Sequence, residues 1–192
     1  MEFMKMLKKK VKFILWMINK KGKPPHIVKE KILKYYTNKF KLDTLIETGT
    51  YEGEMVWELR KKFKKIFSIE LNPILASKAK RKFFNLRNIK IIQGDSTKEL
   101  GALLRKVSPP CLFWLDAHYS GKGTSKGEKE TPIEEELKTI FNHSPKNVIL
   151  IDDADDFGKG DYLSIGKLKK LVKKGKEIKL KNNVIRIYPS KD

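Results

Sequence analysis

Three aspartates and a histidine follow the two most apolar segments of the chain. Asp116 and His118 close the run CLFWLDAH at 111–118, and Asp152 and Asp153 close NVILIDD at 147–153. Runs this apolar are typical of strands buried on both faces of a parallel sheet. If the two strands are neighbours, their ends lie roughly one strand spacing apart, about 4.8 Å. Three carboxylates at one point suit Mg²⁺ or Ca²⁺.

A glycine turn earlier in the chain has the spacing of a ligand-binding turn. In LDTLIETGTYEG at 42–53, an apolar run ends in Glu47, and Gly49 and Gly53 precede the helix-like residues 54–63. This order predicts a strand, a tight turn and a helix whose free N–H groups can face a ligand. The pattern E-x-G-x-x-x-G is not the G-x-G-x-x-G of pyrophosphate sites. Alone, such a turn is as often structural.

The other predicted strands also end in acids. Residues 65–70 and 88–95 read as strands that end at Glu70 and Asp95, so all five apolar strands carry an acid at the same end. Acids gathered at one sheet edge repel one another, which predicts a cationic ligand, ribose hydroxyls or a metal ion there. Chance clustering is the alternative, because Asp is common at helix N-caps.

The intervening segments complete an α/β pattern. Helices are expected at 73–84, 97–107, 132–143 and 163–174, and strands at 177–180 and 184–188 are joined at Asn182-Asn183. Strands that alternate with helices predict a doubly wound, mostly parallel seven-stranded sheet, here with an antiparallel C-terminal hairpin. The glycine-rich loop at 119–131 is expected to be a mobile lid, and Asp155 and Asp156 to be helix-capping or solvated residues.

Length, cysteine content and charge exclude several classes. The 192 residues suit one globular domain, and the single Cys111 excludes an internal disulfide framework. With no visible signal peptide, a cytoplasmic location is expected. The net charge of +20 is carried by the ends, with +11 in residues 1–41 and +8 in 167–192. A basic end suits phospholipid or nucleic acid, and it also serves plain solubility.

The chain divides into an N-terminal helical segment, 1–41, and a ligand-binding domain, 42–192. Residues 3–19 and 26–40 read as helices, and His26, beside two prolines, is expected to be structural. The first helix is too short and too basic to span a bilayer. It lies on the inner face of the membrane, packs on the domain or caps a substrate cleft. Its apolar stripe comprises Met4, Leu7, Val11, Ile14, Leu15 and Ile18, opposite Lys5, Lys8, Lys9 and Lys12.

The ordered set of motifs over residues 42–189 resembles the class I S-adenosylmethionine-dependent methyltransferases. The glycine turn is similar to the family's first motif, which lies against the methionine part of the cofactor. The resemblance implies that Glu70 takes the ribose hydroxyls and that Asp95 lies near the adenine. Such carboxylates accept hydroxyl donors well. The cofactor-binding residues it implies are Glu47, Thr48, Gly49, Thr50, Gly53, Glu70, Asp95, Ser96 and Asp116.

The second half of the site resembles that of metal-dependent O-methyltransferases of the catechol and sugar types. This resemblance implies that Asp116, Asp152 and Asp153 hold Mg²⁺ or another divalent cation, which would bind neighbouring acceptor hydroxyls. His118, with Asp116, would be catalytic, because a histidine can take the hydroxyl proton near neutral pH. The alternative is a loop histidine that binds substrate or caps the strand. The stretches DAHYSG and TPIEEEL also resemble proteins of surface-glycan pathways, so a sugar, glycan or other small diol is the expected acceptor.

Three other classes of protein are rival readings, the first being nucleic-acid methyltransferases of two kinds. An amino-methylating nucleic-acid enzyme would show [DNS]-P-P-[YFW] after the fourth strand, where this chain has Asp-Ala-His-Tyr at 116–119. An RNA ribose 2′-O-methyltransferase is compatible with the basic ends. A membrane-associated binding module with a relic cofactor fold is disfavoured by acids at every strand end. The missing G-x-G-x-x-G disfavours an NAD(P) oxidoreductase.

Overall fold

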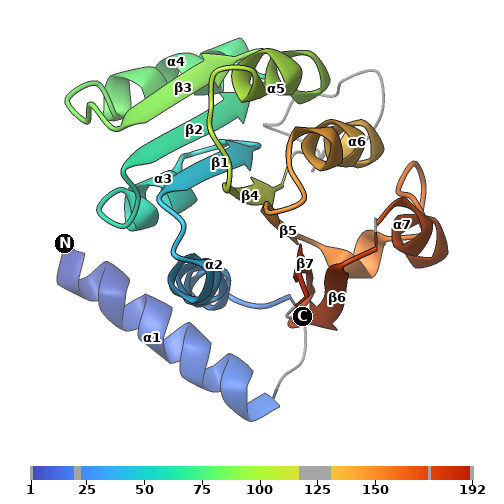
Figure 1. Cartoon of the computed structure of the whole chain (residues 1–192). Coiled ribbons are helices and arrows are strands. Elements are labelled where there is room, and N and C mark those ends of the chain that lie inside the picture. The colour runs from blue at the N-terminus through green and yellow to red at the C-terminus, as the bar shows by residue number, and fades with distance from the viewer. Residues whose placement is uncertain (1, 20–22, 117–130, 173, 191–192) are drawn as a thin grey trace.

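Seven strands form one sheet in the order β3-β2-β1-β4-β5-β7-β6 (Figure 1). The structure is a computed structural model that describes residues 2–19, 23–116, 131–172 and 174–190. The strands are β1 Thr44–Thr48, β2 Lys65–Glu70, β3 Ile89–Gln93, β4 Leu112–Leu115, β5 Val148–Ile151, β6 Lys176–Lys181 and β7 Val184–Pro189. The helices are α1 Glu2–Asn19, α2 His26–Phe40, α3 Glu54–Leu59, α4 Pro73–Lys82, α5 Ser96–Leu104, α6 Ile133–His143 and α7 Ile165–Leu171, with a 3-10 turn η1 at Ala154–Asp156.

The predicted fold is confirmed. Strands β3, β2, β1, β4 and β5 run parallel, whereas β7 pairs antiparallel with both β5 and β6. The β6–β7 connection is the predicted Asn182-Asn183 turn, and both residues have positive φ, 54° and 53°. Two-residue hairpin loops need that conformation, and asparagine tolerates it better than most residues.

Alternating side chains of the sheet build two cores, one on each face. On one face Leu45 and Trp114 pack with α2, α3 and α4. On the other face Ile46 and Phe113 pack with α5, α6 and α7. Strands β4 and β5 are buried at every position, as a strand covered by helices on both faces must be. The sheet is therefore a rigid platform whose carboxyl edge carries the predicted site.

Several element ends differ from the predicted ones. Helix α3 ends at Leu59, not at residue 63, because the chain turns into β2 through i→i+3 bonds such as Lys62 N–H to the Leu59 carbonyl, 2.8 Å. Residues 105–107 lie beyond α5, and β4 ends at Leu115. Asp155 and Asp156 lie within the 3-10 turn and cap no longer helix. The expected lid at 119–131 lies outside the described residues except for Thr131, which is buried.

The N-terminal helices differ in how much they bury. Helix α2 contributes Ile32, Leu33 and Tyr36 to the core. Helix α1 touches the domain through Phe13 and Trp16, which are partly buried against that core. Side chains at 2–6, 8, 9 and 19 lie outside the described ones, so the predicted places of Met4, Lys5, Lys8 and Lys9 do too. Within the described ranges, no helix has the length and apolar character to cross a membrane.

Candidate active site at the carboxyl edge of the sheet

The backbone ladder brings the strand-end acids to one edge. Thr48 is paired with Leu115, and Leu115 with Ile151, so Asp116 and Asp152 follow at neighbouring positions. The ladder continues one residue past the strands. The Asp116 N–H donates to the Thr48 carbonyl and the Asp152 N–H to the Leu115 carbonyl, each at 3.0 Å. These hydrogen bonds fix the backbone positions from which the Asp116 and Asp152 side chains extend.

Glu70 holds the glycine turn in place. Its Oε2 accepts the backbone N–H of Tyr51 at 2.7 Å, and its Oε1 accepts that of Asn72 at 2.9 Å. Within the turn, Gly49 has φ 87° and Gly53 has φ 67°. A Cβ on Gly53 would lie 2.8 Å from the Phe83 ring. Both glycines are therefore needed for the turn itself, and each oxygen of Glu70 keeps a lone pair for a hydroxyl donor.

Glu47 is a carboxyl group inside the protein. It is 2% exposed and accepts a hydrogen bond from the Ser68 hydroxyl, which also pairs with Thr50 Oγ1 at 2.6 Å. Burial raises the pKa of Glu47 to about 8; the Ser68 bond opposes the rise, and the charges of Asp116 and Glu70 add to it. A cation placed beside Glu47 would reverse this shift.

Asp95, Ser96 and Thr48 lie around a second buried carboxyl group. Asp95 caps α5, and its Oδ1 accepts from the N–H and the hydroxyl of Thr97 at 2.9 and 2.7 Å. Glu136 on α6 is 1% exposed, and burial raises its pKa to about 7, with Ser96 and Thr48 acting in the opposite direction. By distance and angle, however, Glu136 Oε1 and Thr48 Oγ1 have no hydrogen-bond partner among the described residues. Both atoms are therefore buried with unused hydrogen-bonding capacity.

A lysine from α2 reaches the acid at the end of β5. Lys29 Nζ donates to Asp152 Oδ2, and the two side chains are 18% and 1% exposed. Burial alone would lower the pKa of Lys29, but the charges of Asp152 and Asp116 outweigh it, and the net shift is upward. Burial and the charge of Asp116 raise the pKa of Asp152, against the effect of Lys29.

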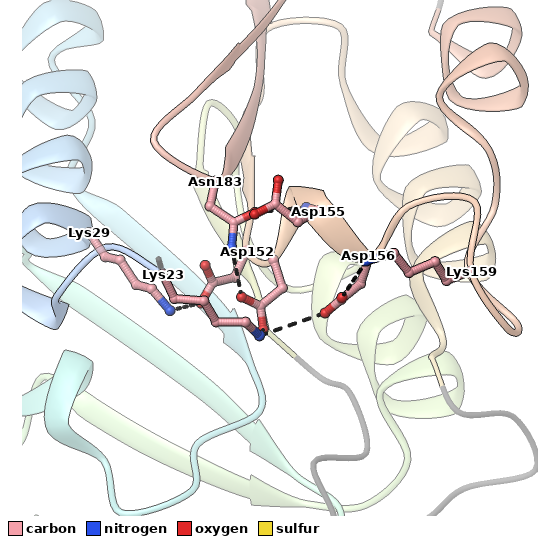
Figure 2. Close-up of polar contacts among 8 residues, drawn as sticks. Lys23, Lys29, Asp152, Asp155, Asp156, Lys159 and Asn183 are labelled. Carbon is pink, nitrogen blue, oxygen red and sulfur yellow. Dashed lines mark hydrogen bonds and ion pairs between the residues drawn. The ribbon is translucent and has the colours of Figure 1, made fainter. Parts of the chain in front are cut away.

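A second lysine and an asparagine bind the next acid (Figure 2). Lys23 Nζ lies 2.8 Å from Asp153 Oδ2 and 3.7 Å from Asp156 Oδ2. Asn183, in the β6–β7 turn, donates to Asp153 Oδ1 at 3.1 Å and accepts the Asp155 N–H at 2.7 Å. Asp153 itself has φ 50°. The hairpin therefore holds the acid loop in a conformation that non-glycine residues seldom adopt.

These positions leave the predicted roles of the site residues untested. Asp116 and Asp152 are brought together as expected, and His118 lies outside the described residues. In the part of the chain that the structure describes, no three His, Cys, Asp or Glu side chains are arranged to hold a metal ion. The described acids Asp152 and Asp153 bind lysines instead.

Four residues of the site were not predicted. Lys23 and Lys29 pair with acids 130 and 123 positions away, a separation that no local pattern reveals. The contacts of Asn183 depend on the tertiary fold in the same way. Glu136 did leave a signal, because it falls inside the apolar stripe Ile133, Leu137 and Ile140, where a solvated glutamate does not belong.

Comparisons with known proteins support the fold strongly. No family model matches the sequence. The O-methyltransferase from Bacillus cereus in complex with SAH superposes with a TM-score of 0.60 at 12% identity, over 91% of this chain and 86% of that one. TomG, an O-methyltransferase from Streptomyces achromogenes in complex with SAM, gives 0.60 at 12%, over 85% and 80%. The SAH-bound methyltransferase PaMTH1 from Podospora anserina gives 0.58 at 15%, over 85% and 78%.

Two curated relatives match a short part of the sequence. Each carries the name probable ribosomal RNA small subunit methyltransferase A. The Methanosarcina barkeri protein is 39% identical over 56 residues, and the Methanosarcina acetivorans protein is 36% identical over 56 residues. The match spans 29% of this chain and about a fifth of each relative, 20% and 21%. Sheet order, C-terminal hairpin and structural neighbours agree that the chain has the fold of the class I S-adenosylmethionine-dependent methyltransferases.

Proposed function

We propose that this protein is an S-adenosylmethionine-dependent O-methyltransferase that acts on a hydroxyl of a sugar, a glycan or another small diol. One observation carries the proposal. The glycine turn, which Glu70 holds, follows β1, and Asp116 and Asp152 follow β4 and β5, so both groups lie at the same edge of one sheet. Ligands of open α/β sheets bind at that edge. Structural neighbours named as O-methyltransferases with SAM or SAH support the reaction type.

For this reaction the protein has to position the acceptor oxygen against the methyl group and provide a base for the hydroxyl proton. The acceptor oxygen attacks the methyl carbon, the carbon–sulfur bond breaks with its electron pair going to sulfur, and the hydroxyl proton leaves to a base. Glu47, Glu70 and Asp116 make the cofactor side acidic, which suits a sulfonium cation. His118 is our predicted base, with Asp116 beside the acceptor.

The predicted Mg²⁺ does not fit the described residues as they are arranged. Asp152 and Asp153 each already hold an ammonium group, and Asp153 Oδ1 is also bonded to Asn183. A divalent ion would have to displace two lysines. Metal dependence therefore stays a separate prediction, and no step above passes through a metal ion.

Calorimetric titration of S-adenosylhomocysteine, with and without Mg²⁺, tests the proposal. We expect micromolar binding in both conditions, weakened at least about tenfold by Glu70→Ala, because one charged hydrogen-bond partner is worth roughly 1.5–3 kcal/mol. Glu52→Ala, exposed on the same turn, is the matched control. Absence of binding to the folded wild-type protein would refute the cofactor assignment. Transfer of labelled methyl groups to a panel of sugars and catechols then identifies the acceptor.

An RNA acceptor is the second candidate function. It is favoured by the two curated relatives named as ribosomal RNA methyltransferases and by the basic ends of the chain. Binding to RNA would weaken steeply as salt rises, because phosphate contacts release counterions. Methyl transfer to RNA and to none of the diols would decide for this candidate.

A further inference from the structure

Lys29 and Asp152 form an ion pair between α2, a helix that packs into the core, and the end of β5. Lys29 lies on α2 next to the buried Val28, yet its ammonium reaches across to the end of β5. Asp152 is 3% exposed, and its second oxygen, Oδ1, has no hydrogen-bond partner among the described residues. A buried carboxylate oxygen without a donor is costly, so a ligand that brings a donor would be favoured there.

Stability alone does not explain such a pair. A buried ion pair is often no more stabilising than well-packed apolar side chains, since both charges lose their water. This pair also lies beside Asp116, at the edge where open α/β sheets bind their ligands. Position and the unused oxygen both indicate a binding centre.

We propose that Lys29 is the built-in cation of the acceptor site and stands in the place predicted for a divalent metal ion. Lys23, which is more exposed, neutralises Asp153 in the same way. This inference rests on the proposed function for the identity of the acceptor. An acceptor oxygen would meet an ammonium N–H in place of a metal ion, and its hydroxyl would donate to Asp152 Oδ1. Methyl transfer would then proceed unchanged in the presence of a chelator.

Manganese binding, followed by electron paramagnetic resonance on the full chain, tests this proposal. Wild-type protein is expected to bind Mn²⁺ weakly or not at all. Lys29→Met removes the competing charge and is expected to tighten Mn²⁺ binding at least about tenfold, since like charges a few ångströms apart repel strongly near a protein surface. The double variant Lys29→Met/Asp152→Asn should lose that gain. Lys34→Met, on the same helix and paired with Glu30, is the matched control.

Two outcomes would overturn the proposal: tight Mn²⁺ binding by the wild type that Asp152→Asn removes, or no gain in Lys29→Met. Thermal melts check folding first, because Lys29→Met leaves a buried carboxylate without its cation. If it does not fold, Lys29→Gln, which removes the charge but keeps a hydrogen-bond donor for Asp152, carries the test with the same two outcomes. Titration of S-adenosylhomocysteine into the same samples reports separately on the proposed function.

A different observation concerns α1, which is apolar on two opposite sides. Phe13 and Trp16 face the domain. The other side presents an outer stripe in which every side chain is 44–73% exposed: Leu7, Val11, Ile14, Leu15 and Ile18. These positions follow helical spacing and form one continuous band. Contiguous exposed apolar surface is typical of interaction sites.

We infer that the outer stripe of α1 docks on an anionic lipid surface. Lysines make up the charge around it: residues 1–41 carry a net +11, and Lys10 and Lys12 are exposed on the helix. A helix with an apolar stripe and basic flanks lies in the plane of a membrane interface, where both are satisfied. Figure 1 shows α1 along the outside of the domain, beside α2.

Sedimentation with phosphatidylcholine vesicles, with and without phosphatidylserine, tests the docking. We expect binding only to the anionic vesicles and its loss at high salt. Ile14→Glu should weaken binding at least about tenfold, because it removes an apolar side chain from the docked stripe and adds a negative charge there. Phe84→Glu, an 85% exposed side chain elsewhere, should bind as the wild type does. Equal binding by Ile14→Glu, a dimer that Ile14→Glu dissolves, or binding to RNA alone would each overturn the inference.

Discussion

Replacing Glu47 by glutamine should change how the stability of this protein depends on pH. The ordinary pKa of the group, 4.5, is raised to about 8 in the fold, mainly by burial. The unfolded chain therefore releases this proton at lower pH than the folded protein does. The favourable contribution of protonated Glu47 is complete below pH 4.5 and is lost as the pH rises towards 8. The free energy of unfolding should fall by about 1.4 kcal/mol per pH unit within this window.

The comparison of wild type with Glu47→Gln isolates this one group, because the other carboxyl groups with raised pKa values contribute equally to the stability of both proteins. Glutamine keeps an acceptor for the Ser68 hydroxyl. Chemical denaturation at about pH 5 and about pH 8 should show the wild type losing roughly 4 kcal/mol more than the variant. Glu52→Gln, an exposed glutamate of the same turn, should follow the wild type. Parallel curves for wild type and Glu47→Gln would refute a protonated Glu47 at neutral pH.

Three further substitutions test the surroundings of the site. Gly53→Ala should cost about 1–3 kcal/mol more in denaturation than Gly175→Ala, because both have positive φ but only the first Cβ would strike a ring. Asn183→Ala should cost about 1–2 kcal/mol more than Asn182→Ala, measured in thermal melts, since both share a left-handed backbone and only Asn183 bonds the acid loop. Glu136→Gln should flatten the pH dependence of the melting temperature between pH 4.5 and about 7, because burial raises the pKa of that group.

Apolar runs and glycine turns made most of the fold predictable. Strands β4 and β5 are buried at every position, so their sequences report their environment directly. The hairpin turn was also predictable from local sequence, because asparagine tolerates the positive φ that both turn residues adopt. Element ends were less so: α3 ends early because the entry to β2 requires a turn. The position of β2 in the sheet imposes this turn, and the sequence of the helix does not indicate it.

The site was predictable only in part, for a similar reason. Parallel strands must end at one edge, so the meeting of Asp116 and Asp152 follows from the order of the strands. What neutralises these acids does not follow, because Lys29 comes from a helix far away in the sequence. A chain with 43 Lys and Arg residues offers too many candidates for composition to single one out.

The two halves of the site balance their negative charge by different means. On the proposed acceptor side, Asp152 is matched by an ammonium group that belongs to the chain. On the proposed cofactor side, burial raises the pKa of Glu47 to about 8, so a proton balances the charge of this group at neutral pH. A proton, unlike Lys29, can leave when a mobile cation arrives.

This difference predicts that S-adenosylmethionine and S-adenosylhomocysteine bind with different proton release. The sulfonium of the first would lower the pKa of Glu47 and expel its proton, whereas the second carries no such charge. Calorimetry at about pH 7, repeated in buffers of different ionisation enthalpy, should show up to about one proton released with the sulfonium ligand and little with the other. Glu47→Gln should remove the difference while leaving the binding of S-adenosylhomocysteine nearly unchanged. Equal proton release by the two ligands in the wild type would mean that Glu47 does not face the sulfonium, and the cofactor would then have to sit elsewhere along the edge.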